Sequence, residues 1–178
     1  SNPAGLFLEE RSNDASGSVV CACLEGNRPI LVEVQALVAK TPYGMPRRTA
    51  VGFDYNRVTM LLAILERRLG MDFGAYDAYV NVVGGMRVTE PAADLAVAAA
   101  LVSSYRNRPI PHGVLVMGEV GLTGEVRRIG SPERRIKDAM NLGFKRFVLP
   151  MGKLSLDEPC NGIVQVKTLE EALDKVFA

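Results

Sequence analysis

The chain has 178 residues and is 48% hydrophobic, which is enough to bury the core of one ordinary domain and excludes wholesale disorder. Its 21 basic and 20 acidic residues leave a net charge of +1. No run of about 18 apolar residues predicts a membrane span, and the first residues lack a signal-peptide pattern, so we expect a protein of the cytoplasm with no membrane partner.

The first half of the chain predicts a linker followed by strands and one helix. Residues 1–17 are polar and rich in turn formers, so the folded domain is expected over residues 18–178. Helical spacing predicts a helix that opens at Asp54 and stops at Gly70, with arginines in its last turn. Apolar alternation predicts the strands of this half over residues 18–24, 29–38, 49–53 and 78–83.

The second half alternates helices and strands. An alanine-rich helix is expected over residues 91–105, with Thr89 as its candidate N-cap. Another helix is expected to begin at Ser131, whose hydroxyl would cap it, and the last at the capping box of Thr168 and Glu171. The strands predicted here are 113–118, 125–129, 146–150 and 162–166. This order predicts an α+β fold in which helices cover a mixed sheet.

Cysteine and histidine are too sparse to predict a metal site. Cys21 and Cys23 alternate within an apolar strand, so both are expected to be buried on one face of it. Cys160 stands apart from them, and His112 falls in a turn-like stretch that predicts a surface loop.

Arginine makes up 15 of the basic residues and is concentrated in doublets. The doublets are at positions 47–48, 67–68, 127–128 and 134–135. Guanidinium groups suit phosphate binding and also suit subunit interfaces. The doublet 67–68 is explained by the dipole of its helix, but four doublets in a nearly neutral chain indicate a clustered basic surface.

Two segments carry a resemblance to a known family. One is the helix start Pro91-Ala92-Ala93-Asp94, preceded by a strand and two glycines, and the other runs from Gly118-Glu119 to the helix near Glu133. Together they resemble the Lon-type serine-lysine peptidase domain. The resemblance implies an α/β sandwich of the ribosomal protein S5 domain 2-like type.

Within that group, longer segments resemble the C-terminal domain of the RadA (Sms) family of bacterial DNA repair proteins. These segments are 34–38, 46–49, 54–57, 81–85, 87–97 and 118–125. The resemblance implies a six-membered ring, preceded in the parent protein by a zinc-binding segment and a RecA-like ATPase motor. ATP, magnesium and zinc are then expected only in those other parts, and no cofactor is expected in this chain.

The residues argue against peptidase chemistry. Where the Lon family has its serine this chain has Ala92, which offers no nucleophilic atom, and where the family has its lysine it has Glu133. A carboxylate there has the wrong sign for stabilising an oxyanion. Ser103 and Ser104 lie about three helical turns from the helix start, and Ser131 is expected to act as a cap, so none of them replaces the lost serine.

We therefore expect a non-proteolytic, ring-forming and DNA-binding domain of a RadA-type ATPase. The parent would process recombination intermediates by branch migration with RecA recombinase. Single-stranded or branched DNA would be held through phosphates, without sequence specificity, because the chain has no Trp and few aromatic residues to stack on bases. The first candidates for DNA contact are Arg47, Arg48, Arg127 and Arg128, and the second are Arg57, Arg87, Arg134 and Arg135.

Two alternatives stay open. The domain would be purely structural if it only closed a ring, with its arginines paired at subunit interfaces to acids such as Asp94, Glu119 or Glu133. The less favoured alternative is a residual Lon-type serine peptidase.

Overall fold

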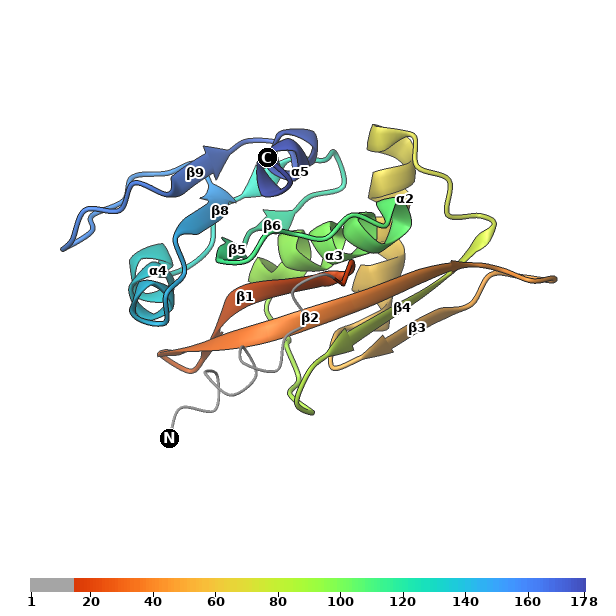
Figure 1. The fold of residues 1–178 in the computed structure, drawn as a ribbon, viewed down its shortest axis with the longest axis horizontal. Coiled ribbons are helices and arrows are strands. Elements are labelled where there is room, and N and C mark those ends of the chain that lie inside the picture. The colour runs from red at the N-terminus through yellow and green to blue at the C-terminus, as the bar shows by residue number, and fades with distance from the viewer. Residues whose placement is uncertain (1–14) are drawn as a thin grey trace.

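The computed structural model describes residues 15–178, which build one seven-stranded mixed sheet with helices packed on it (Figure 1). The strand order is β3-β4-β2-β1-β5-β8-β9, and β6 pairs separately with β7. The antiparallel pairs β1–β2 and β2–β4 lie beside parallel pairs, so the predicted α+β class with a mixed sheet is confirmed. The strands are β1 (Ser18–Glu25), β2 (Arg28–Lys40), β3 (Arg48–Val51), β4 (Tyr76–Val82), β5 (Val114–Val116), β6 (Glu119–Val120), β7 (Val126–Arg127), β8 (Arg146–Pro150) and β9 (Ile163–Val166).

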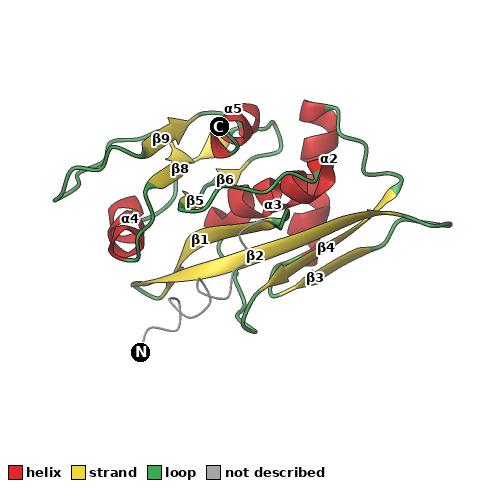
Figure 2. Cartoon of the chain, viewed as in Figure 1, coloured by secondary structure: helices red, strands yellow, loops and turns green. Residues whose placement is uncertain are grey.

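Helices α2 and α3 cover one face of the sheet (Figure 2). The helices of the described residues are α2 (Tyr55–Leu69), α3 (Asp94–Arg106), α4 (Pro132–Asn141) and α5 (Leu169–Val176), with the short 3-10 helix η1 (Pro91–Ala93) leading into α3. Every residue of α3 from Asp94 to Ser103 is buried. A helix that is apolar on all sides belongs in the interior, and small alanines let it lie close to β1 and β2.

The other face of the sheet is only partly covered. At the β1–β2 hairpin end, where α4 contacts both strands, residues of this face such as Ala22 and Leu31 are buried. Farther along β2 the same face carries Gln35 and Leu37, which are exposed. The sheet therefore has an open surface over β2, β4 and β3.

All four predicted helix starts are confirmed, and two of them have the side-chain cap as well. Asp54 Oδ1 accepts a hydrogen bond from Arg57 N at 3.0 Å, and Thr168 Oγ1 accepts one from Glu171 N at 3.1 Å. The side-chain caps predicted at Ser131 and Thr89 are wrong. Ser131 has a left-handed backbone (φ 52°) and makes no side-chain cap bond, because a capping hydroxyl needs an extended backbone to reach back to the helix. Thr89 does not cap either, because the helical segment starts one residue later, after Glu90.

The structure describes the chain to its last residue but not from its first. The first fourteen residues of the expected linker lie outside the described residues. Gly17 already belongs to the folded body, since its N–H donates to Ser103 Oγ at 2.8 Å and its carbonyl accepts from Ala36 N at 2.8 Å. Among residues 15–178, no helix has the length and apolar character needed to span a bilayer.

Candidate functional site

Ala92, which the resemblance aligns with the peptidase serine, lies in a buried turn at the start of α3. Ala92 is the middle residue of η1, and its carbonyl accepts from Gly118 N at 2.8 Å. The carbonyl of Gly118 in turn accepts from Leu95 N at 2.9 Å, so η1 is joined by the backbone to the segment between β5 and β6. Cys21 Sγ on β1 lies 3.9 Å from the Ala92 carbonyl oxygen. The hydrogen bond with the neighbouring Cys23, and then burial, raise the pKa of Cys21, which keeps it a thiol.

One ion pair involves Glu90, two residues before Ala92. Arg135 is 1% exposed and donates to both oxygens of Glu90, at 2.6 and 3.0 Å. Its remaining donors reach the carbonyls of Ala22 and Gly130, each at 2.8 Å. The backbone N–H of Leu24 also donates to Glu90, at 2.7 Å. This pair ties α4 to β1 and to the entrance of η1.

A second ion pair lies directly after Ala92. The fully buried carboxylate of Asp94 accepts from Arg57 Nε at 2.7 Å, from Arg57 Nη2, and from Val120 N at 3.1 Å. Burial raises the pKa of Asp94, and the bonds from Arg57 and Val120 oppose that rise. The same contact raises the pKa of Arg57. Asp94 is thus paired within its own chain and is not available to pair with an arginine of a neighbouring subunit.

Glu133, which the resemblance aligns with the peptidase lysine, belongs to a separate contact. Glu133 lies in the first turn of α4, and its Oε1 accepts from Ser155 N at 3.3 Å. The serines of α3 also have structural partners. Ser103 Oγ donates to Arg108 O at 2.6 Å, and Ser104 Oγ accepts from Val38 N at 2.8 Å.

Three of the eight arginines predicted to contact DNA have structural roles instead. Arg135 is buried, so its placement among the DNA contacts is corrected. Arg57 is 27% exposed, but its guanidinium is held by Asp94. Arg48 donates to the carbonyls of Phe73, at 2.9 Å, and Tyr76. Doublets mislead here because neighbouring residues of a helix or strand point in different directions, and one member can turn inward.

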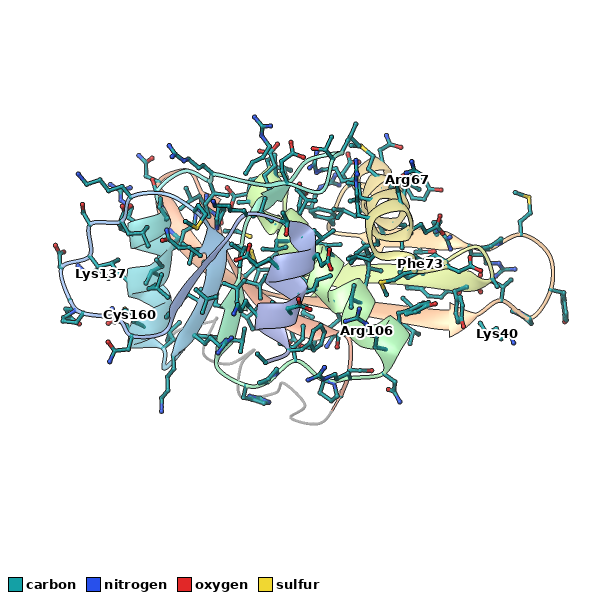
Figure 3. The ribbon with its side chains drawn as sticks, turned by 90° about the horizontal axis from the view of Figure 1, so that it is seen from above. Lys40, Arg67, Phe73, Arg106, Lys137 and Cys160 are labelled. Atoms are coloured by element: carbon teal, nitrogen blue, oxygen red, sulfur yellow. The ribbon has the colours of Figure 1, made fainter. Side chains whose placement is uncertain are left out.

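The other five predicted arginines are exposed but do not form one patch. They are Arg47, Arg87, Arg127, Arg128 and Arg134. The helix that carries Arg134, α4, lies at the opposite end of the molecule from the loop between β2 and β3 beside Arg47 (Figure 1). In Figure 3, Lys40 likewise lies far from Lys137 and Cys160. Arg47 and Arg134 therefore do not belong to one compact basic patch.

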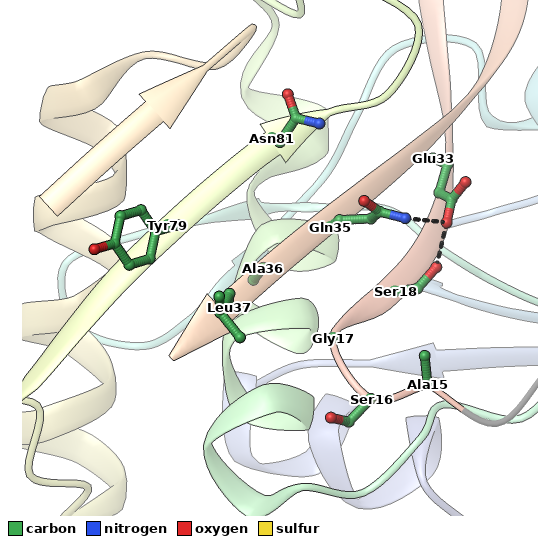
Figure 4. A pocket seen from close by; sticks show the side chains of 10 residues that line it. All are labelled: Ala15, Ser16, Gly17, Ser18, Glu33, Gln35, Ala36, Leu37, Tyr79 and Asn81. Atoms are coloured by element: carbon green, nitrogen blue, oxygen red, sulfur yellow. Dashed lines mark hydrogen bonds between the residues drawn. The ribbon is translucent and has the colours of Figure 1, made fainter. Parts of the chain in front are cut away.

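A shallow cavity of about 310 Å³ lies on the open face of the sheet (Figure 4). The carboxylate of Glu33 lies at its edge and accepts from Ser18 Oγ at 2.6 Å and from Gln35 Nε2 at 3.1 Å. Leu37 and Tyr79, which are cross-strand partners, form its apolar side. Elsewhere, no group of three or more His, Cys, Asp or Glu side chains within residues 15–178 is placed to hold a metal ion.

Sequence reasoning missed a feature of the loop between β2 and β3. Tyr43 and Met45 are 90% and 88% exposed, far more than the other large apolar residues of the described chain. The signal was present in the stretch Thr41-Pro-Tyr-Gly-Met-Pro46, where prolines and glycine predict a turn around two large apolar side chains.

Comparison with known proteins assigns the chain to a family. A family model described as subunit ChlI of Mg-chelatase matches residues 34–153. Proteins named DNA repair protein RadA are similar over nearly the whole chain. The one from Halalkalibacterium halodurans is 48% identical over 177 residues, covering 97% of this chain and 38% of that protein. Those from Pseudomonas aeruginosa and Bacillus subtilis are 49% and 48% identical, covering 99% and 97% of this chain and 39% and 38% of theirs.

The chain thus spans about two fifths of the length of these relatives. The family model covers well over half of the chain, and the RadA proteins match it almost from end to end. The chain belongs to the family of that ChlI model and is a RadA-type domain.

Proposed function

We propose that this chain is the non-proteolytic, ring-forming and DNA-binding domain of a RadA-type DNA repair ATPase. The name of the relatives supports the repair role. The observation that most supports the absence of proteolysis is that an ion pair lies on either side of Ala92 in the sequence. The strand order and the buried helix after η1 fit the Lon-type, ribosomal protein S5 domain 2-like fold.

The ion pairs replace catalytic machinery with structural contacts. Glu90 and Asp94 are two residues before and two residues after Ala92, and each binds an arginine from another helix. Covalent peptide cleavage needs a nucleophile and a base within hydrogen-bond reach of each other. Here a methyl group occupies the first position, and the second carries a carboxylate bonded to a backbone amide.

A peptidase assay tests this part of the proposal. The chain is incubated with casein and with a fluorogenic peptide, and hydrolysis is compared with that of buffer. We expect no rate above buffer. Turnover that is lost when Glu133 is replaced by glutamine would overturn the non-proteolytic assignment.

The exposed arginines support DNA binding through phosphates. Arg127 and Arg128 lie at the end of β7, and the Arg128 side chain passes over Gly152, which has no side chain to block it. Arginine contacts to phosphate release counterions, so affinity falls steeply as salt rises. Each phosphate contact makes the slope of log affinity against log salt steeper, by about 0.9 on duplex DNA and by about 0.7 on single strands.

Fluorescence anisotropy over a salt series measures this contribution. We expect the Arg127→Ala, Arg128→Ala double variant to bind labelled DNA more weakly and with a shallower salt slope. Arg106→Ala is the matched control, since Arg106 is also exposed but ends α3 and is not among the candidates. Equal affinities and slopes for the wild type and the double variant would remove this pair from the DNA surface.

The open sheet face supports the ring. Leu37 and Val51 are 58% and 55% exposed on β2 and β3. Leu37 is the cross-strand partner of Tyr79 on β4, and Val51 is the partner of Asn81, the next residue of β4 on this face. Contiguous apolar side chains on a sheet face are typical of protein contacts. This observation also favours the second candidate, a structural ring domain without DNA contact. We expect Leu37→Glu to lower the mass measured by light scattering, and an unchanged mass would exclude this face from assembly.

The activity of the longer protein is part of the same proposal. Other parts of it would bind ATP, magnesium and zinc, and it would process recombination intermediates in the cytoplasm together with RecA recombinase. This domain would supply the ring and part of the DNA surface.

A further inference from the structure

The loop between β2 and β3 extends away from the body of the domain (Figure 1). Strand β2 runs to Lys40, and residues 42–46, here called the finger, connect it to β3. Lys40 lies near this end of the molecule in Figure 3. The tip residues Tyr43 and Met45 are almost entirely in solvent. Two large apolar side chains held in water are unfavourable for an isolated domain, so a binding role is indicated.

The base of the finger is held firmly. Asp77 Oδ1 accepts from Thr41 Oγ1 at 3.0 Å and from Arg47 N at 2.7 Å, so one carboxylate oxygen joins both legs. These bonds, that of Arg47 N first, hold the pKa of Asp77 below its ordinary value. Thr41 N also donates to Ala75 O at 2.8 Å. The finger is therefore presented on a fixed base, which lowers the entropy lost when it binds a partner.

The positively charged residues beside the finger indicate which kind of partner it binds. Lys40 and Arg47 are exposed on its two legs, and the neighbouring Asp77 is buried and bonded. An aromatic ring between two cations matches a single strand of nucleic acid, in which bases stack on the ring and flanking phosphates pair with the cations. A stacked base in duplex DNA has no free face for the ring.

We propose that the finger is a single-strand binding element, in which Tyr43 stacks on an unpaired base while Lys40 and Arg47 bind the adjacent phosphates. Met45 would pack against the same base or its neighbour. This inference rests on the proposed DNA-binding function and names the form of DNA and the residues that recognise it. It differs from the expectation that the chain has few aromatic residues to stack on bases.

Fluorescence anisotropy of the 178-residue chain with a labelled dT oligonucleotide and with a duplex of the same length tests the proposal. We expect Tyr43→Ala to weaken single-strand binding about tenfold and to leave duplex binding within about twofold. Tyr43→Phe keeps the ring and is expected to bind as the wild type does. The salt slope is unchanged in Tyr43→Ala, because no phosphate contact is lost, whereas Arg47→Ala makes the slope shallower by about 0.7.

Tyr55→Ala is the matched control, since Tyr55 is 52% exposed on α2, away from the finger. A second readout uses the absence of tryptophan from the chain. In Tyr43→Trp, the single tryptophan is expected to lose fluorescence when the oligonucleotide stacks on it, whereas in Tyr55→Trp it is not.

The outcomes separate this inference from the proposed function. If the wild type binds neither DNA, the proposed DNA binding fails and the inference fails with it. If the wild type binds but Tyr43→Ala binds the single strand equally well, the inference alone is overturned. If Tyr43→Ala lowers the mass seen by light scattering without DNA, the finger is a contact between copies of the chain, and the inference is likewise overturned.

Discussion

Replacing Arg135 with methionine removes a buried cation that makes four hydrogen bonds. Methionine keeps the apolar stem of the side chain but donates nothing. The carbonyls of Ala22 and Gly130 then lose the bonds from Arg135, and the carboxylate of Glu90 keeps only the bond from Leu24 N, in a site that excludes most water. Breaking a buried ion pair by removing one member costs about 3–5 kcal/mol. Since domains of this size are stable by about 5–15 kcal/mol, we expect Arg135→Met to lose about 4 kcal/mol, a large part of the total.

Urea unfolding followed by circular dichroism measures the loss. Arg134→Met is the matched control, because Arg134 is the preceding residue of the same helix, is exposed, and makes a single bond to Asn27 O at 3.1 Å. We expect it to cost less than about 0.5 kcal/mol, as surface substitutions usually do. Glu90→Gln combined with Arg135→Met is expected to cost clearly less than the sum of the two single changes, by at least about 1 kcal/mol, because both remove the same contact.

Two results would refute this reasoning. A loss below about 1 kcal/mol in Arg135→Met, or one no larger than in Arg134→Met, would mean that the pair does not hold the fold together. A variant of unchanged stability that binds DNA more weakly would return Arg135 to the DNA contacts.

The remaining predictions concern the other buried acids and one glycine. We expect Asp94→Ala to lower the free energy of unfolding by about 3 kcal/mol in urea, because it leaves Arg57 without its partner in a mostly buried site, and a loss below about 1 kcal/mol would contradict this. Asp77 has a lowered pKa in the folded protein, so its stabilising effect is complete above its ordinary value of 3.8 and is lost as the pH falls through the folded value. The melting temperatures of the wild type and Asp77→Asn are therefore expected to differ at pH 6 and to converge in acid. A difference in melting temperature that does not change with pH would contradict the stabilising role of the Asp77 carboxylate. Gly17→Ala should destabilise the fold measurably in the same urea assay, since a Cβ there would lie 2.2 Å from the carbonyl oxygen of Ala36 at a φ of +91°, and normal stability would exclude that clash.

Local sequence rules worked where a signal is complete within a few residues. The caps at Asp54 and Thr168 were predicted because each needs only an oxygen and an amide three residues later. The burial of Cys21 and Cys23 followed from alternation along one strand, and the exposure of His112 from its turn. Ser131 has the right residue type for a cap but a left-handed backbone, which its neighbours in the fold impose and the local pattern does not reveal.

At the candidate site, too, residue types could be read from the sequence but contacts between distant residues could not. The resemblance to the Lon family implied that Ala92 and Glu133 occupy the two dyad positions, and this stays a prediction. The sequence did not reveal that Arg135 pairs with Glu90 or that Arg57 pairs with Asp94, since these partners are 45 and 37 residues apart. Nor did it distinguish arginines that face solvent from those that face inward.

By itself, then, the amino-acid sequence determined the α+β class and most of the strands and helices, because hydrophobic period and residue type are local quantities. Only the tertiary structure decided which charges are buried, which face of the sheet stays open and how far the finger extends. These depend on what packs against each side chain, and segments distant in the chain supply that packing.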